Sequence, residues 1–253
     1  PNGSGKTTLL GVLSTLAEPS RGSVTYPALA DGDTPRRAIG VLGHEPQLYG
    51  ELTARENLAL FARLAGVADV PSAVARALEQ ARLADRGDDP TERFSRGMRQ
   101  RLAFERVLLP EPRLLLLDEP FTGLDDDSAH RMVTRLAALR DAGACIVLAT
   151  HDLLLVERLV DRAFIVKGGV LVPLDRTLSL AEAYRAAVAG DGRDGSPSRP
   201  DAPVGRDGSP SRPDRGGLGE PALPSPESSL AEIVRTAWVL FAKDLQIEWR
   251  SRE

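Results

Sequence analysis

Residues 1–8 form a short glycine-rich stretch that ends in a lysine and two threonines. Small residues let the backbone wrap an anion, and the N–H groups at the start of the following helix then point toward phosphate oxygens. In such a loop Lys6 would bridge the β and γ phosphates, Thr7 would bind Mg²⁺ through its hydroxyl, and Thr8 would touch the α phosphate. The candidate nucleotide-binding residues are Asn2, Gly3, Ser4, Gly5, Lys6, Thr7 and Thr8.

Two carboxylates follow an unbroken run of leucines at residues 114–119, LLLLDE. This pattern is typical of a buried strand in a parallel sheet, and ligands of open α/β sheets bind beyond the carboxyl ends of such strands. Asp118 would hold Mg²⁺, and Glu119 would act as general base or orient the water that attacks the γ phosphate. Strands that end in acidic residues are common, so this interpretation depends on the phosphate-binding stretch at residues 1–8.

Short apolar runs alternate with longer amphipathic segments along residues 1–189, and the elements that they form must position these groups. Residues 1–189 therefore predict an α/β domain with a mostly parallel sheet. We expect helices near residues 5–16, 54–65, 71–84, 96–109, 127–142 and 152–160, and strands near 23–26, 38–43, 113–118, 144–149 and 163–167.

The rest of the chain has a different composition. Residues 190–229 contain 23 Gly, Pro and Ser among 40 positions, and the string GRDGSPSRPD occurs at 192–201 and again at 205–214. A segment this poor in apolar residues predicts a disordered linker. Residues 230–253 predict an amphipathic helix, because seven apolar residues recur there at helical spacing. They are Leu230, Val234, Ala237, Trp238, Phe241, Leu245 and Trp249.

The overall composition excludes several classes of protein. The hydrophobic share of 42% and charged share of 27% are those of a globular protein. A net charge of −4 disfavours nucleic acid as a partner. The single cysteine, Cys145, cannot form an internal disulfide, and its apolar surroundings predict a buried position. The chain starts at Pro1 inside the glycine-rich motif, so we expect a sequence that is incomplete at its N-terminus.

Five motifs occur in the order found in one large family. Between the glycine-rich loop and the end of the strand at 149 lie GHEPQLYGELTARENL with Gln47, FSRGMRQRL at residues 94–102, LLLLDE, and TGLD with Asp125; ATHD with His151 follows. Over about residues 1–189 the chain resembles the ATPases of ABC transporters. The resemblance implies a P-loop NTPase fold of the ABC ATPase type, with a mostly parallel sheet and a helical subdomain at about 50–109.

The resemblance also implies roles for individual residues. In this family two ATP-binding domains close head to tail around ATP, so the signature residues Ser95, Arg96, Gly97 and Met98 would contact ATP bound by the partner. Asp125 of the D-loop would reach across the dimer. Glu119, His151 and Gln47 would be the catalytic residues, and Thr7, Gln47 and Asp118 would hold Mg²⁺.

Two departures from the family pattern point to a subgroup. Arg96 stands where the signature has its first glycine, and Met98 stands where it has glutamine. FSRGM followed by a basic residue resembles the haem-exporter ATP-binding subunits of cytochrome c maturation (CcmA type). Residues 237–253 resemble the N-terminal segment of their permease (CcmB type). This implies a peripheral ATPase at the cytoplasmic face of the plasma membrane, fused to the beginning of its permease.

Other interpretations stay open at this point. The chain would have the same phosphate-site residues if it served an exporter of drugs, ions or lipids. Two further interpretations are a non-transport ABC-type ATPase, of the kind that acts in translation or DNA repair, and a binding-only module. The helix predicted at residues 230–253 would equally pack back on the ATPase domain.

Overall fold

The computed structural model describes residues 5–26, 35–167 and 170–189. Three of the candidate phosphate-binding residues, Asn2, Gly3 and Ser4, lie outside the described residues. The predicted linker at 190–229 and the predicted amphipathic helix at 230–253 lie outside them as well. Within the part that the structure describes, no helix combines the length and the apolar character needed to cross a bilayer.

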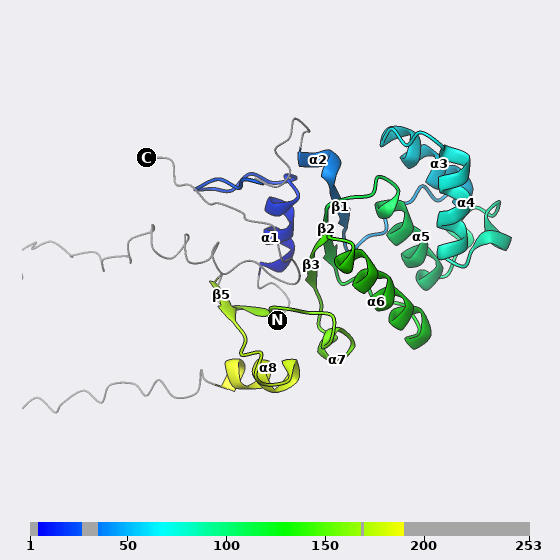
Figure 1. Cartoon of the computed structure of the whole chain (residues 1–253). Coiled ribbons are helices and arrows are strands. Elements are labelled where there is room, and N and C mark those ends of the chain that lie inside the picture. Colours follow the sequence, from blue (N-terminus) through cyan, green and yellow to red (C-terminus); the bar gives the residue numbers. More distant parts are fainter. Residues whose placement is uncertain (1–4, 27–34, 168–169, 190–253) are drawn as a thin grey trace, which may run out of the picture.

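A three-stranded parallel sheet forms the centre of the described chain. Its strands are β1 (Ile39–Leu42), β2 (Leu114–Asp118) and β3 (Cys145–Ala149), in the order β1-β2-β3. Every residue of β2 is buried, because β2 is the middle strand and both faces of the sheet are covered (Figure 1). A strand in this environment needs apolar residues at successive positions rather than alternate ones, which explains the run of four leucines.

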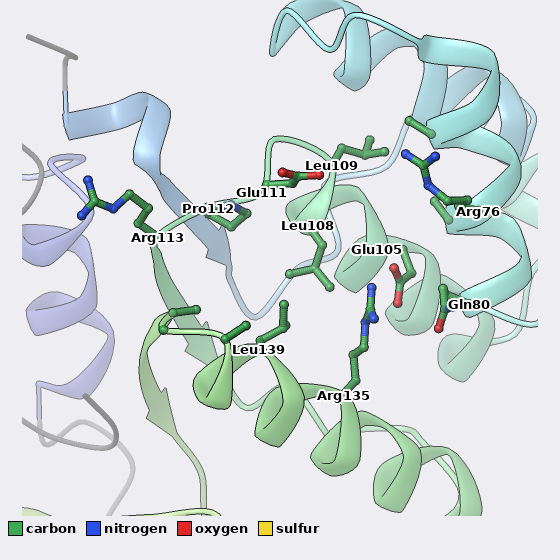
Figure 2. Close-up of a pocket in the computed structure, with 15 residues that line it drawn as sticks. Arg76, Gln80, Glu105, Leu108, Leu109, Glu111, Pro112, Arg113, Arg135 and Leu139 are labelled. Atoms are coloured by element: carbon green, nitrogen blue, oxygen red, sulfur yellow. The ribbon is translucent and has the colours of Figure 1, made fainter. Parts of the chain in front are cut away.

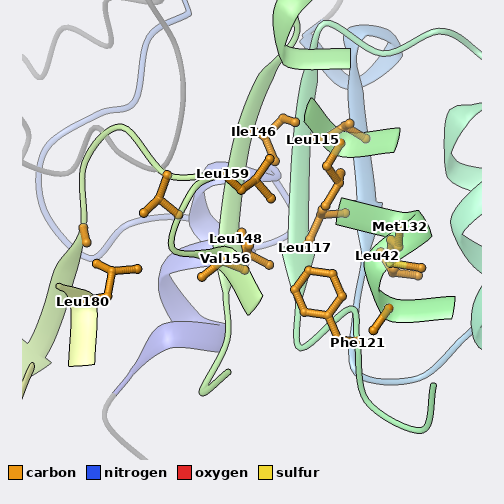
Figure 3. Packing of buried hydrophobic residues seen from close by; sticks show 14 of the residues in the cluster. Leu42, Leu115, Leu117, Phe121, Met132, Ile146, Leu148, Val156, Leu159 and Leu180 are labelled. Carbon is orange, nitrogen blue, oxygen red and sulfur yellow. The ribbon is translucent and has the colours of Figure 1, made fainter. Parts of the chain in front are cut away.

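Alternate leucines of β2 pack into different apolar clusters. Leu115 and Leu117 join a large cluster with residues of β3, α6 (Asp126–Asp141), α7 (Leu153–Val156) and α8 (Leu180–Ala189) (Figure 3). Leu114 and Leu116 face the other side, where they meet α1 (Lys6–Leu13) and the ring of Tyr26. The period of two along a strand therefore divides the domain into two layers around the sheet.

Three helices pack together beside the sheet: α3 (Ala54–Leu64), α4 (Val70–Gln80) and α5 (Arg96–Leu108) (Figure 1). They share an apolar cluster with Leu83 and Phe94. Helix α5 also packs on the sheet, because its residues Ala103, Phe104 and Val107 belong to the large cluster. A capping box starts α3, because the Thr53 side chain accepts from the Glu56 backbone N–H and the Glu56 carboxylate accepts from the Thr53 backbone N–H. We call α3, α4 and α5 the helical group; it occupies the range predicted for the helical subdomain.

The remaining elements are short. They are α2 (Pro35–Ala38), 3₁₀ turns at Ala84–Arg86 and Thr91–Arg93, and an antiparallel hairpin of β4 (Phe164–Lys167) and β5 (Val170–Pro173).

The α/β fold with a mostly parallel sheet is confirmed, but some predicted elements are wrong. Residues 23–26 are not a strand. Tyr26 instead packs on α1, and its hydroxyl donates to the Leu13 carbonyl at 2.5 Å. Burial raises the pKa of this phenol to about 12. The helix expected at 152–160 is reduced to the four residues of α7, whereas β5 and α8 were not anticipated.

The central position of β2 gives a stability prediction. Leu116→Ala removes a side chain with 0% exposure, and we expect it to lower the free energy of unfolding by about 2–5 kcal/mol. Leu154→Ala is the matched control, because Leu154 is 80% exposed and its loss should change stability by less than about 0.5 kcal/mol. Urea denaturation followed by circular dichroism measures both. Equal effects would contradict the role assigned to β2.

Candidate functional site

The sheet register brings two loops together at the carboxyl ends of β2 and β3. Asp118 pairs with Ala149, and the next residue, Glu119, donates its backbone N–H to the Ala149 carbonyl at 2.8 Å. His151 therefore arrives beside Glu119, and its Nδ1 lies 2.8 Å from Glu119 Oε2. The Glu119 side chain is 21% exposed, whereas that of His151 is 82% exposed. The carboxylate is thus held from the solvent side by the imidazole.

A second contact joins the N-terminal helix to the end of β2. Gly5 has a left-handed conformation (φ 98°) and precedes α1, and Thr7 in the first turn donates its hydroxyl to Asp118 Oδ2 at 2.8 Å. Asp118 itself is buried. A hydroxyl oxygen and a carboxylate oxygen in contact are the ligand types that Mg²⁺ prefers. The two residues predicted from separate motifs to hold Mg²⁺ are therefore neighbours.

The chemistry of this donor set fits a particular kind of metal site. No group of three or more His, Cys, Asp and Glu side chains that could hold a metal ion occurs in the described ranges. A closed protein cage is therefore not formed by these residues. The Thr7–Asp118 pair fits instead a cation such as Mg²⁺ that takes few protein ligands and completes its shell with water and phosphate oxygens.

Lys6, Glu119 and His151 line one cavity of about 660 Å³. Its polar wall also includes Thr150 and His44, a residue for which the sequence suggested no role. Its apolar wall comes from α1, β3, the hairpin and α8. The cavity thus places the amine of the candidate phosphate loop, the candidate base and the candidate switch histidine around one space.

The signature residues form the beginning of α5. Ser95 is the N-cap, and its hydroxyl accepts from the Met98 backbone N–H at 3.2 Å. Ser95 and Arg96 are exposed, and Gly97 is half-buried. The Met98 side chain packs against the apolar cluster of the helical group. Met98 is therefore a packing residue in this chain, and Ser95, Arg96 and Gly97 form the surface of the turn.

This turn packs directly against the segment that follows Glu119. A Cβ on Gly97 would lie 2.8 Å from the Gly123 carbonyl oxygen, and a Cβ on Gly123 would lie 2.7 Å from Cδ of Arg96. Gly123 also has a left-handed conformation, with φ 81°. The buried Gln100 side chain donates to the Pro120 carbonyl at 2.9 Å. This role of Gln100 was not predicted from the sequence, where its only signal was a polar residue within an apolar helix face.

Asp125 ends the same segment and begins α6. Its carboxylate accepts from the Ser128 backbone N–H at 2.7 Å, as expected of an N-cap. Hydrogen bonds from Ser128 hold the pKa of Asp125 below its usual range. Asp125 has an intramolecular capping role here, and its predicted contact with a second ATP-binding domain stays a prediction.

Gln47 is not joined to the other candidates. It is exposed, with a left-handed φ of 49°, and none of the described hydrogen bonds links it to Thr7 or Asp118. Its predicted roles at Mg²⁺ and at the attacking water stay predictions. Likewise, no described hydrogen bond joins Ser95 or Asp125 to the Thr7–Asp118 pair.

The loop after Gln47 is held by a residue that sequence analysis also missed. Asn57 is fully buried in α3, and its side-chain oxygen accepts from the Tyr49 N–H at 2.9 Å. Its amide nitrogen donates to the carbonyls of Tyr49, Leu52 and Thr53 at 3.0–3.2 Å. The available signal was an asparagine on the apolar face of the helix ARENLALFARL.

Comparison with known proteins gives a consistent result for this part of the chain. A model of the ABC transporter family matches residues 1–122. The chain is 38% identical over 177 residues to a Nod factor export ATP-binding protein I of Bradyrhizobium diazoefficiens, covering 67% of this chain and 57% of that protein. It is 36% identical over 174 residues to the protein of the same name from Rhizobium etli, covering 67% and 55%. The chain thus spans little more than half the length of these curated relatives.

Solved structures agree with the sequence matches. A structure described as the ATP-binding subunit of an ABC transporter superposes with a TM-score of 0.66 and 33% identity, covering 74% of this chain and 85% of that chain. A dimeric ATP-binding cassette bound to ADP and Pi superposes with a TM-score of 0.62 at 24% identity, covering 70% and 82%. The second likeness concerns the fold alone.

The contact between Gly97 and Gly123 gives a prediction for the signature turn. Gly97→Ala should lower the free energy of unfolding by about 1–3 kcal/mol, because the added methyl meets backbone rather than a flexible side chain. Gly43→Ala is the control, since nothing lies within 4 Å of a Cβ at that position. Thermal and urea unfolding measure both. A neutral Gly97→Ala would show that the turn is not packed as described.

Proposed function

This chain belongs to the family of ABC transporter ATP-binding domains, and on that premise we propose that it binds MgATP and hydrolyses it to drive transport. The observation that carries the proposal is the pair of contacts at the end of β2, Thr7–Asp118 and Glu119–His151, each 2.8 Å long. They join groups from separate motifs, a helix N-terminus and the ends of two strands, at one edge of the sheet.

Each residue at this edge has a proposed task. Gly5, Lys6, Thr7 and Thr8 bind the phosphates, with Asn2, Gly3 and Ser4 completing the loop, because an α-helix N-terminus attracts anions. Thr7 and Asp118 hold Mg²⁺, which supplies positive charge against the phosphate oxygens. Glu119 accepts the proton of the attacking water or orients it, and His151 keeps that carboxylate in place and faces the γ phosphate. Gln47 is proposed to approach the same Mg²⁺ and water from its loop.

A second ATP-binding domain is the proposed partner for the signature turn. Ser95 and Arg96 are exposed, and no described hydrogen bond joins them to the Thr7–Asp118 pair. We propose that Ser95, Arg96 and Gly97 contact the γ phosphate bound by another copy in a head-to-tail dimer, and that Asp125 lies at the dimer contact. The positive end of α5 favours an anion at this turn.

The other proposed partner is a membrane permease. We propose that residues 1–189 act as a peripheral ATPase at the cytoplasmic face of the membrane and that the helical group contacts the permease. Residues 190–229 would be a flexible linker. Residues 230–253 would be an amphipathic helix at the beginning of a CcmB-type permease, with Trp238 and Trp249 at the lipid interface.

Two substrates are supported by different observations. The signature variant FSRGM and the resemblance of residues 237–253 to a CcmB-type permease support haem export for cytochrome c biogenesis. The identity of 36–38% to Nod factor export ATP-binding proteins supports a second candidate, an exporter of another substrate. The two candidates differ in the permease and its cargo, and the proposed chemistry at Glu119 is the same in both.

The proposed base is tested with Glu119→Gln in the full-length protein together with its permease. We expect ATP binding to persist and hydrolysis to fall at least about 10²-fold, because a general base contributes roughly that factor. Phosphate release and nucleotide binding are measured in parallel. Glu18→Gln, an exposed change outside the helical group and outside the proposed site, is the control and should leave turnover unaltered. Wild-type turnover in Glu119→Gln would remove Glu119 from its role.

The haem assignment is tested in the source organism by deleting the gene. We expect haem-stained c-type cytochromes to disappear while b-type cytochromes remain, since only the former need exported haem. The wild-type gene should restore them and the Glu119→Gln gene should not. If c-type cytochromes persist after deletion, the haem assignment is wrong and the second candidate remains, whereas the ATPase activity is judged by the preceding experiment alone.

A further inference from the structure

A second cavity, of about 600 Å³, lies on the helical side of the molecule (Figure 2). It is bounded by α4, α5 and α6, by the loop before β2, and by the turn between α6 and β3. No residue lines both this cavity and the one that contains Lys6, Glu119 and His151. The proposed ATPase chemistry makes no use of it.

Glu105 of α5 is the unusual residue of this cavity. It is 7% exposed, and Figure 2 shows its carboxylate directed into the space between α4 and α6. The carboxylate forms no hydrogen bond or ion pair with another described residue. Carboxylates are rarely buried without a partner, because burial disfavours the charged form. Here burial raises the pKa of Glu105 to about 7, although Arg135 acts in the opposite direction.

Arg135 of α6 extends from the other side of the cavity toward Glu105 (Figure 2). The two side chains do not approach within ion-pairing distance, and the buried Nε of Arg135 has no hydrogen-bond acceptor in the described ranges. The buried Nε of Arg135 and the Glu105 carboxylate thus face one space without pairing with each other. A ligand with acceptor oxygens would satisfy both side chains, because it would accept a hydrogen bond from Arg135 and another from protonated Glu105.

The charge of the lining favours an anion. Arg76, Arg113 and Arg135 outnumber Glu105 and Glu111, and the excess grows when Glu105 is protonated. Arg135 of α6 is the charged group that extends toward Glu105. Arg76 of α4 is exposed and donates to the Ser72 hydroxyl, and Figure 2 shows Arg113 directed away from Glu105. The rest of the wall is mainly apolar and is formed by Ala73, Ala77, Leu108, Leu109, Pro112, Leu139, Ala142 and Ala144.

We propose that this cavity is a binding site for a small aliphatic carboxylate, whose anionic group is held by Arg135 and Arg76 and whose apolar body lies on Leu108 and Leu139. Protonated Glu105 donates a hydrogen bond to the ligand carboxylate, and ionised Glu105 repels it. The ligand would touch α4, α5 and α6 at once, so it would tie the helical group to the helix that covers the sheet.

The test uses octanoate as the probe and calorimetric titration of the 253-residue chain at about pH 6 and about pH 8. We expect saturable binding that is tighter at the lower pH. The ratio should reach up to about tenfold, because Glu105 changes from mostly protonated to mostly ionised across this interval. Octanoate should also raise the midpoint of thermal unfolding, since it binds only the folded chain.

Variants assign the site. Arg135→Leu should weaken octanoate binding at least about tenfold, since it removes the charged partner of the carboxylate. Glu105→Gln should retain binding and abolish its pH dependence, because the amide donates at both pH values and carries no charge. Arg63→Leu is the matched control: Arg63 is an exposed arginine on α3 that lines neither cavity, and its removal should leave the affinity within about twofold.

Several results would overturn the proposal. They are the absence of octanoate binding, equal losses in Arg135→Leu and Arg63→Leu, a pH dependence that survives in Glu105→Gln, or tighter binding of octylamine than of octanoate. The last result would identify a cation site at Glu105 instead. Should Arg135→Leu fail to fold, Arg76→Leu, at an exposed position on α4, takes its place with the same expected direction.

Discussion

The burial of β2 between β1 and β3 is the constraint on which the candidate site depends. Because each β2 residue is buried and paired, Asp118 and Glu119 leave the sheet at a fixed point and in a fixed direction. The same register puts His151 next to Glu119. Helix α1 packs on one face of β2, and this packing brings Thr7 to Asp118. The polar contacts at 2.8 Å are consequences of apolar packing several residues away.

A second constraint operates around Gly123. The signature turn cannot move toward Gly123 without a clash between Gly97 and its carbonyl oxygen, and Gln100 ties α5 to Pro120. The segment from Pro120 to Asp125 follows Glu119 directly. These contacts therefore connect the beginning of α5 with the backbone beside the candidate base. Arg96, which fills the space over Gly123, makes this contact tighter than a glycine at position 96 would.

The fold and the contacts at the end of β2 could be predicted from the sequence. Four leucines followed by Asp-Glu predict both a buried parallel strand and carboxylates at its end, and the Thr7–Asp118 neighbourhood follows from that. The sequence was insufficient where side chains act through packing. Gln100 and Asn57 look like ordinary polar residues in the sequence, because their roles depend on carbonyl groups that only the folded loops bring to them. Residues 23–26 have strand-like composition, yet they form no strand, and Tyr26 is instead anchored on α1 by its hydrogen bond to Leu13.

One physical rule applies to both buried carboxylates, Asp118 and Glu105. A carboxylate leaves water only at a cost, and in this fold Asp118 meets that cost with the Thr7 hydroxyl, a partner supplied by another element. Glu105 is as deeply buried as Asp118 and has no such partner among the described residues, so its charge is instead suppressed by a raised pKa. A protein that only needed to fill this position would gain from an apolar residue. The carboxylate, the opposed arginine and the space between them are consistent with a group that must be recognised there, and this is the argument for a ligand.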